Sequence, residues 1–165
     1  MKKFHSDILF KEINPPDYKK NILIKDLAEV LVTRLGLKRK VSRADHAKLL
    51  IELLNLKKEN IPCDIETVAN FLGVSVSQAY EEIRKWRTLG LLEFVKIPKT
   101  ENEFSKGYML SAPTLNRLID RVASSINSFL RRTKRIAKDF DDQFMLEVVR
   151  KERVSENSQT EKKQS

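Results

Sequence analysis

Residues 65–92 read IETVANFLGVSVSQAYEEIRKWRTLGLL, and this segment constrains the fold more than any other part of the 165-residue chain. Gly73 predicts a tight turn between two helices, because glycine adopts left-handed backbone conformations without strain. Ser75 is a typical N-cap for the second helix, which we expect to run to about Leu89. Apolar residues gather on one face of that helix, at Ala79, Ile83 and Trp86. The segment therefore predicts two helices that cross closely and bury this face.

A β-hairpin is predicted directly after these helices. Leu91 to Ile97 and Gly107 to Ser111 have the composition of short strands, and the polar residues 98–106 predict the loop between them. A further helix is expected before the pair, from Arg43 to Lys57, with Ser42 as its N-cap. Residues 43–111 are thus expected to form a helix-turn-helix followed by a small β wing.

This domain resembles the winged helix-turn-helix of prokaryotic transcription regulators, in the pattern A-x-x-L-G-V-S … L-G-L-[IL] that begins here at Ala69 and Leu89. The resemblance implies that the helix after Gly73 enters the major groove of double-stranded DNA while the wing contacts the backbone. The implied DNA-binding residues of the helix are Ser75, Ser77, Gln78, Tyr80, Glu81, Arg84 and Lys85. Those of the wing are Lys96, Lys99 and Lys106.

The charge distribution supports a polyanionic partner only in part. The chain carries a net charge of +9, but residues 43–111 hold ten basic and ten acidic side chains. Glu81 stands where such regulators often carry a basic residue, and Glu82 follows it; facing phosphates, a glutamate is repulsive. A second hypothesis is therefore a protein-interaction subunit of the transcription or replication machinery. A third is a plasmid or viral replication or partition protein that still binds DNA.

Helical segments flank the winged domain. Residues 1–17 are expected to be irregular, and 18–42 to hold a helix from Tyr18 to Leu35 and a basic connector. Residues 112–152 predict a long helical arm, and the polar tail 153–165 is expected to be disordered. The arm carries a heptad seam at Ile119, Val122, Ile126, Phe129, Ile136 and Phe140, typical of a coiled-coil dimer interface.

This order of elements is similar to that of the MarR/GbsR-type regulators. The resemblance implies a homodimer that reads half-sites about 34–36 Å apart, and it leaves room for a small-molecule effector. The expected fold class is mainly α with a small β-hairpin wing.

Other classes of protein are disfavoured by residues the chain lacks. Apolar runs reach only three residues, so no membrane span is expected. The sequence holds one cysteine and two histidines and has no phosphate-binding glycine loop or nucleophile signature. We therefore expect no metal, no cofactor and no enzymatic activity, and a cytoplasmic location; the lysine and isoleucine content suggests an archaeal source. His46 is expected on a helix surface, Cys63 in a buried or half-buried place, and Phe104 exposed in the wing loop.

Overall fold

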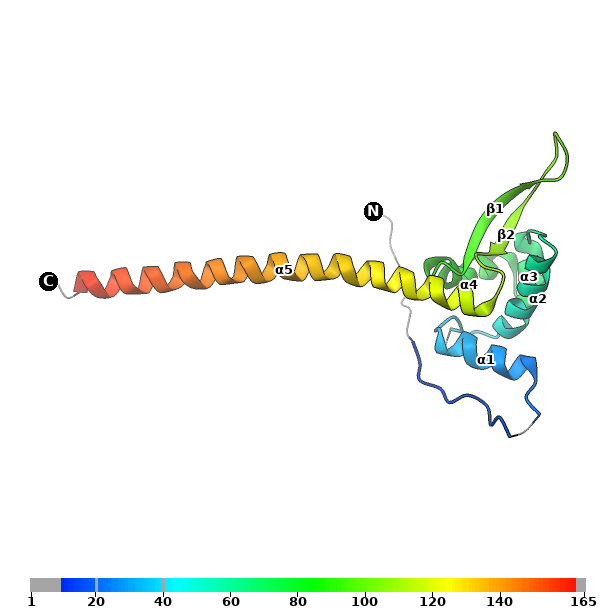
Figure 1. Cartoon of the computed structure of the whole chain (residues 1–165), viewed down its shortest axis with the longest axis horizontal. Helices are drawn as coiled ribbons and strands as arrows, with labels where there is room; N and C mark the ends of the chain where they lie inside the picture. The colour runs from blue at the N-terminus through cyan, green and yellow to red at the C-terminus, as the bar shows by residue number, and fades with distance from the viewer. Residues whose placement is uncertain (1–9, 20, 40, 163–165) are drawn as a thin grey trace. The chain divides into compact units, whose positions relative to one another are not determined.

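The computed structural model describes residues 10–19, 21–39 and 41–162, with side chains up to residue 157. Within these ranges the chain is mainly helical, with one antiparallel hairpin and a long C-terminal helix (Figure 1). The elements are α1 (Ile24–Arg34), α2 (His46–Lys58), α3 (Ile65–Leu72), α4 (Val76–Thr88), β1 (Leu92–Pro98), β2 (Phe104–Leu110) and α5 (Leu115–Lys162). This order is compatible with a winged helix.

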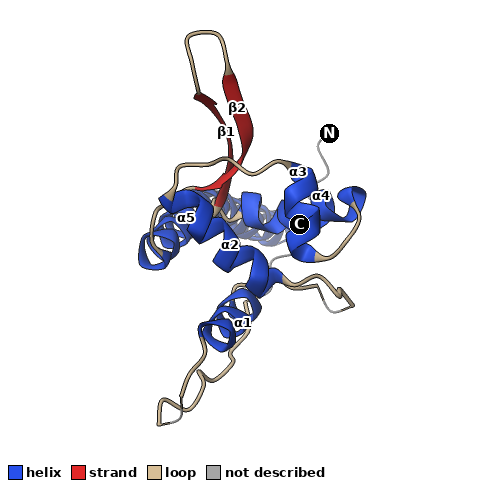
Figure 2. Ribbon diagram, turned by 90° about the vertical axis from the view of Figure 1, so that its right-hand side faces the viewer, coloured by secondary structure: helices blue, strands red, loops and turns tan. Residues whose placement is uncertain are grey.

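The chain divides into two units, Met1–Ala123 and Ser124–Ser165. In the first unit, the hairpin and α1 lie on opposite sides of the layer formed by α2, α3 and α4 (Figure 2). Helices α2 to α4 enclose the core, in which Trp86 and Ala79 are fully buried and Ile83 is 1% exposed, as the sequence predicted. None of the described helices combines the length and apolar character that crossing a membrane requires.

The turn between α3 and α4 has the geometry expected of a glycine cap. Gly73 has a φ of 68°, and the Val74 N–H donates to the Ala69 carbonyl at 3.1 Å. Asp64 caps α3 by accepting from the Thr67 N–H at 2.7 Å. Because each helix end is satisfied locally, the turn holds the beginning of α4 at a fixed angle to α3.

Two helices begin later than predicted. Helix α1 starts at Ile24 rather than Tyr18, because Asp17 accepts a hydrogen bond from the Lys19 N–H at 3.0 Å and so favours a turn there. Helix α2 starts at His46 rather than Arg43, and its N-cap is Asp45, which accepts from the Lys48 N–H. The Ser42 hydroxyl is instead used in a bond to another helix, described below.

The hairpin is longer than predicted on its second side. Strand β2 begins at Phe104, so Lys106 and Phe104 belong to a strand rather than to the loop. An isolated bridge joins the hairpin to the segment before α3: the Cys63 N–H donates to the Tyr108 carbonyl at 2.8 Å, and the Tyr108 N–H donates back at 2.6 Å. Cys63 is buried, as expected.

Gly107 allows this close approach of two backbones. A Cβ added at Gly107 would lie 2.5 Å from the carbonyl oxygen of Cys63, nearer than two such atoms can come. The glycine is therefore required by space, and the bridge fixes the base of the wing to the core.

Helix α5 corrects two predictions about the arm. It continues to Lys162, so residues 153–162 are helical rather than disordered; no glycine or proline follows Pro113, and extending a helix costs little once it has formed. Val122, predicted in the dimer seam, is 4% exposed, and Leu118 nearby is 1% exposed, so both are buried. Val122 therefore serves the core of the first unit instead of an exposed seam.

Candidate nucleic-acid interface

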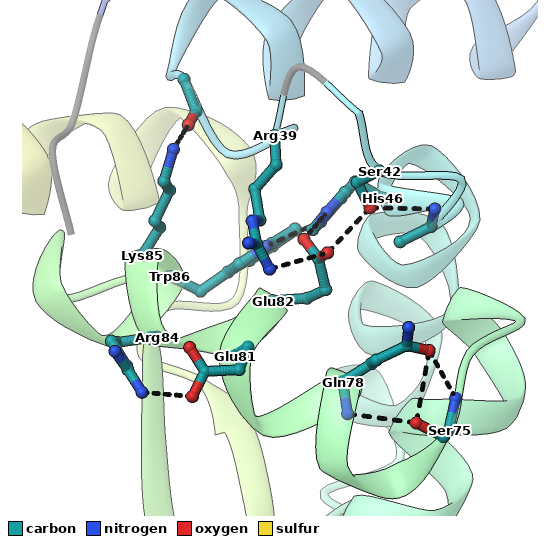
Figure 3. A network of polar contacts seen from close by, with 12 residues as sticks. Arg39, Ser42, His46, Ser75, Gln78, Glu81, Glu82, Arg84, Lys85 and Trp86 are labelled. Carbon is teal, nitrogen blue, oxygen red and sulfur yellow. Dashed lines mark hydrogen bonds and ion pairs between the residues drawn. The ribbon is translucent and has the colours of Figure 1, made fainter. Parts of the chain in front are cut away.

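The beginning of α4 is organised by a capping box. The Ser75 hydroxyl accepts from the Gln78 N–H at 3.3 Å, and the Gln78 Oε1 accepts from the Ser75 N–H at 3.2 Å (Figure 3). Both residues were predicted to contact DNA, and both are exposed. Their side chains also cap the helix, so a side chain that contacts a base from here would already be fixed in position by the capping box.

The outer face of α4 presents most of the predicted side chains together. Ser77, Tyr80, Glu81 and Arg84 are exposed, while the opposite face is buried. Arg84 forms an ion pair with Glu81 one turn away (Figure 3). This pair neutralises Glu81 locally, which reduces the repulsion that the sequence predicted against phosphates.

Lys85 is separated from this group. Its ammonium donates to the Gly36 carbonyl, just after α1, at 3.1 Å, and its side chain is half-buried. Lys85 therefore ties α4 to the end of α1, which is a different use from the base or phosphate contact predicted for it.

Glu82 occupies the buried side of α4, so the predicted acidic pair with Glu81 does not form on the surface. Glu82 is 4% exposed, and its carboxylate accepts from the Ser42 hydroxyl at 2.8 Å and bonds to His46 Nε2 at 3.0 Å (Figure 3). Arg39 lies 3.7 Å from the same carboxylate. Helix α4 is thereby joined to α2 and to the connector before it by a polar network.

His46 is 1% exposed, which contradicts the prediction of a surface histidine. The Trp86 indole N–H lies 3.1 Å from His46 Nδ1. An indole N–H can only donate, so Nδ1 accepts, and the proton of a neutral imidazole is on Nε2, facing Glu82. No local pattern predicts this buried group, because His46 is 36 positions from Glu82 and 40 positions from Trp86 along the chain.

The network also determines how Glu82 ionises. Burial raises the pKa of Glu82, but hydrogen bonds from His46 and Ser42 and the nearby Arg39 charge outweigh burial, so the pKa lies below its ordinary value of 4.5. Glu82 is thus a buried carboxylate anion at neutral pH. Its role is to hold α2 and α4 together beneath the exposed face of α4.

The wing places two lysines opposite one another. Lys96 on β1 is the register partner of Lys106 on β2, so their side chains lie on the same face of the hairpin. Both are exposed, as is Lys99 in the loop. Two like charges at directly opposed positions destabilise a hairpin slightly, so this pair adds positive charge to the wing rather than stability.

Aromatic rings accompany these lysines on the same hairpin face. The Lys96 ammonium lies 4.0 Å from the centre of the Phe104 ring, which is half exposed. Phe94 packs edge-on against Tyr108 at 5.3 Å, and Arg87 of α4 lies over Tyr108 at 5.9 Å. Arg87 and Phe94 were not predicted as site residues. Phe94 could have been found from the sequence, because it stands two residues before Lys96 on β1 and therefore shares its face of the strand.

An apolar groove lies elsewhere in the first unit. It has a volume of about 770 Å³ and is lined by α1, α2 and the first turns of α5. Leu27, Leu31, Leu54 and Ile119 form its walls, and Arg34 and Lys58 also line it. Ile119, predicted in the dimer seam, thus faces this groove.

Comparisons with known proteins add little to this geometry. No protein-family model matches the chain, and a search of curated proteins gave no match. Among solved structures, the chain is similar to one called "Possible transcriptional regulator from Methanosarcina mazei Go1". The two are 16% identical over 55% of this chain and 84% of the other, with a TM-score of 0.29. A likeness at that TM-score carries no argument about function.

Proposed function

We propose that the chain is a sequence-specific, double-stranded DNA-binding transcription regulator of winged helix-turn-helix type that acts as a homodimer without catalysis. In this proposal α4 enters the major groove, where Ser77, Gln78, Tyr80 and Arg84 contact bases or the adjacent backbone. The hairpin lies on the phosphate backbone. The arm of α5 joins two copies.

The opposed pair Lys96–Lys106 is the observation that carries the proposal. These exposed lysines share one face of a hairpin that the Cys63–Tyr108 bridge joins to the segment before α3 and whose strand β1 contacts α4. Together they provide a charged surface next to a helix whose outer face is polar and exposed. Because Glu82 is buried and Glu81 is paired with Arg84, the two glutamates repel phosphates less than their sequence positions alone predict.

The test measures binding to random-sequence duplex DNA by fluorescence anisotropy at several salt concentrations. We expect the affinity to fall steeply with salt, and the double variant Lys96→Ala/Lys106→Ala to bind at least tenfold more weakly. Its slope of log affinity against log salt should be smaller by about two, one unit for each lost phosphate contact.

The double variant Lys48→Ala/Lys58→Ala is the matched control, because it removes the same number of charges from exposed lysines of α2 rather than of the wing. It should leave both the affinity and the salt slope close to those of the unchanged protein. Equal loss in both variants would mean that binding follows net charge alone, and no binding at low salt would refute the proposal.

The alternative function is a protein-interaction module. It is favoured by apolar side chains on the same surface, since Val76, Tyr80 and Phe94 are all exposed. Such a module would bind its partner with little dependence on salt and would ignore duplex DNA.

For the effector, we propose the groove between α1 and α2 as the binding place. Its volume and its aliphatic walls suit a small apolar molecule.

A further inference from the structure

The part of α5 that belongs to the second unit carries an uncovered apolar stripe. Phe129 is 59% exposed, Phe140 is 66% and Phe144 is 56%. With about 100° of rotation per residue, these rings share one side of the helix with Leu130, Thr133, Ala137 and Val148. Along the stripe, large side chains at residues 129 and 130 are followed by the small Thr133 and Ala137, and then by Phe140 and Phe144.

Charge changes sign along the same part of the helix. Residues 131–138 contain five basic side chains and no acidic one, and residues 139–147 contain four acidic side chains and no basic one. The charged side chains with described positions in these two blocks are exposed. The change of sign falls between Lys138 and Asp139, at the centre of the stripe.

An antiparallel pair of these helices, centred on that point, matches size with size. A two-fold axis between Lys138 and Asp139 brings Phe140 opposite the partner's Ala137 and Phe144 opposite the partner's Thr133. Phe129 then meets the partner's Val148. Each phenyl ring is thus received by a small or short side chain, and each contact occurs twice because the interface is two-fold.

The same arrangement matches charge on both flanks of the stripe. Lys134 lies within one turn of the partner's Asp141 on one flank, and Arg132 within one turn of the partner's Glu147 on the other. Each basic block thereby faces an acidic block. A parallel pair in register would instead bring Lys134 beside the partner's Arg132 and Asp141 beside the partner's Asp139, and like charges there repel.

We propose that the occupant of this stripe is a second copy of the chain, bound antiparallel with the two-fold axis between Lys138 and Asp139. This inference rests on the homodimer of the proposed function and goes beyond it by giving the orientation of the arms. It follows from the succession of Thr133, Ala137, Phe140 and Phe144 together with the reversal of charge between residues 138 and 139.

Disulfide trapping in the full-length chain tests the orientation. Thr133→Cys and Phe144→Cys chains, given tags of different mass, are mixed and mildly oxidised. Antiparallel arms give mixed disulfides and no homodisulfides, because equivalent positions are then about 16 Å apart along the axis and a disulfide bridges Cα atoms only up to about 7 Å. Parallel arms give the reverse pattern. The unchanged chain is the control, since its one cysteine, Cys63, is buried.

Charge reversal gives a second measurement that does not depend on trapping. By sedimentation equilibrium, Lys134→Glu should weaken an antiparallel dimer at least threefold, and Lys134→Glu/Asp141→Lys should restore it. In a parallel dimer Lys134→Glu would strengthen association, because the partner's Arg132 is its neighbour there.

The outcomes separate this inference from the function on which it rests. Homodisulfides in a dimer, or a dimer strengthened by Lys134→Glu, overturn the antiparallel orientation and leave DNA binding intact. A monomer in sedimentation overturns the pairing together with the proposed homodimer. A monomer that also fails to bind duplex DNA in the anisotropy assay overturns the proposed function as a whole.

Discussion

Replacing Glu82 by Ala should lower the free energy of unfolding far more than the same replacement at its exposed neighbour Glu81. The change leaves the Nε2–H of His46 without an acceptor at a site that is 1% exposed, and it removes the acceptor of the Ser42 hydroxyl. A buried donor left unpaired costs about 1–3 kcal/mol. Ser42 is half-buried, so water replaces part of its lost bond. We expect a total loss of about 2–4 kcal/mol in the free energy of unfolding.

Differential scanning calorimetry at pH 7 measures this loss. For a chain of this size, each kcal/mol lowers the melting temperature by about 3 °C, so Glu82→Ala should melt about 6–12 °C lower. Urea unfolding followed by circular dichroism should give the same ordering of variants.

Glu81→Ala is the matched control, because Glu81 precedes Glu82 on the same helix and forms an exposed ion pair with Arg84. Exposed pairs contribute about 0–1 kcal/mol, so this variant should melt within about 3 °C of the unchanged protein. A Glu82→Ala protein as stable as Glu81→Ala would refute the view that the buried network joins α2 to α4.

Three further predictions concern acid, the bridge and the thiol. Because the pKa of Glu82 is lowered in the folded protein, its contribution to stability is complete above its ordinary pKa of 4.5 and is lost as the pH falls through the lower folded value. In an acid titration, Glu82→Ala should therefore lose stability less steeply than the unchanged protein. Gly107→Ala should lower the free energy of unfolding in urea by at least about 2 kcal/mol, because the new Cβ would collide with the Cys63 carbonyl. Gly73→Ala should lower it by only about 1–2 kcal/mol, because its Cβ meets open space and only the positive φ is unfavourable. Burial raises the pKa of Cys63 to about 12, so iodoacetamide at pH 8 should leave the folded protein unmodified. The same reagent should alkylate Cys63 when the protein is unfolded in urea. Rapid labelling of the folded protein would contradict this prediction.

Local signals predicted the centre of the domain well. Gly73, Ser75 and the buried face of α4 are specified within one short segment, and turn, cap and apolar spacing all indicate the same structure there. The predicted burial of Trp86 was confirmed for the same reason. Where neighbouring residues alone decide the conformation, the sequence was sufficient.

Long-range partners were not accessible from the sequence. His46 and Glu82 are 36 positions apart, and a histidine followed by an alanine and a lysine gives no sign of a buried acceptor. Serine is a common cap, so the sequence predicts Ser42 as the N-cap of α2, whereas the Ser42 hydroxyl bonds to Glu82 and Asp45 caps the helix. Polar composition predicts disorder after residue 152, whereas α5 continues to Lys162.

The place of Trp86 has a consequence for solution experiments. It is the chain's one tryptophan, it is fully buried, and its ring lies 6.0 Å from that of His46 between α2 and α4. Intrinsic emission from this protein therefore reports on the contact between these two helices and not on the exposed face of α4. If duplex DNA docks on a rigid domain, the emission stays constant while anisotropy rises. A change in emission on adding DNA would instead show that α4 shifts against α2 when it binds.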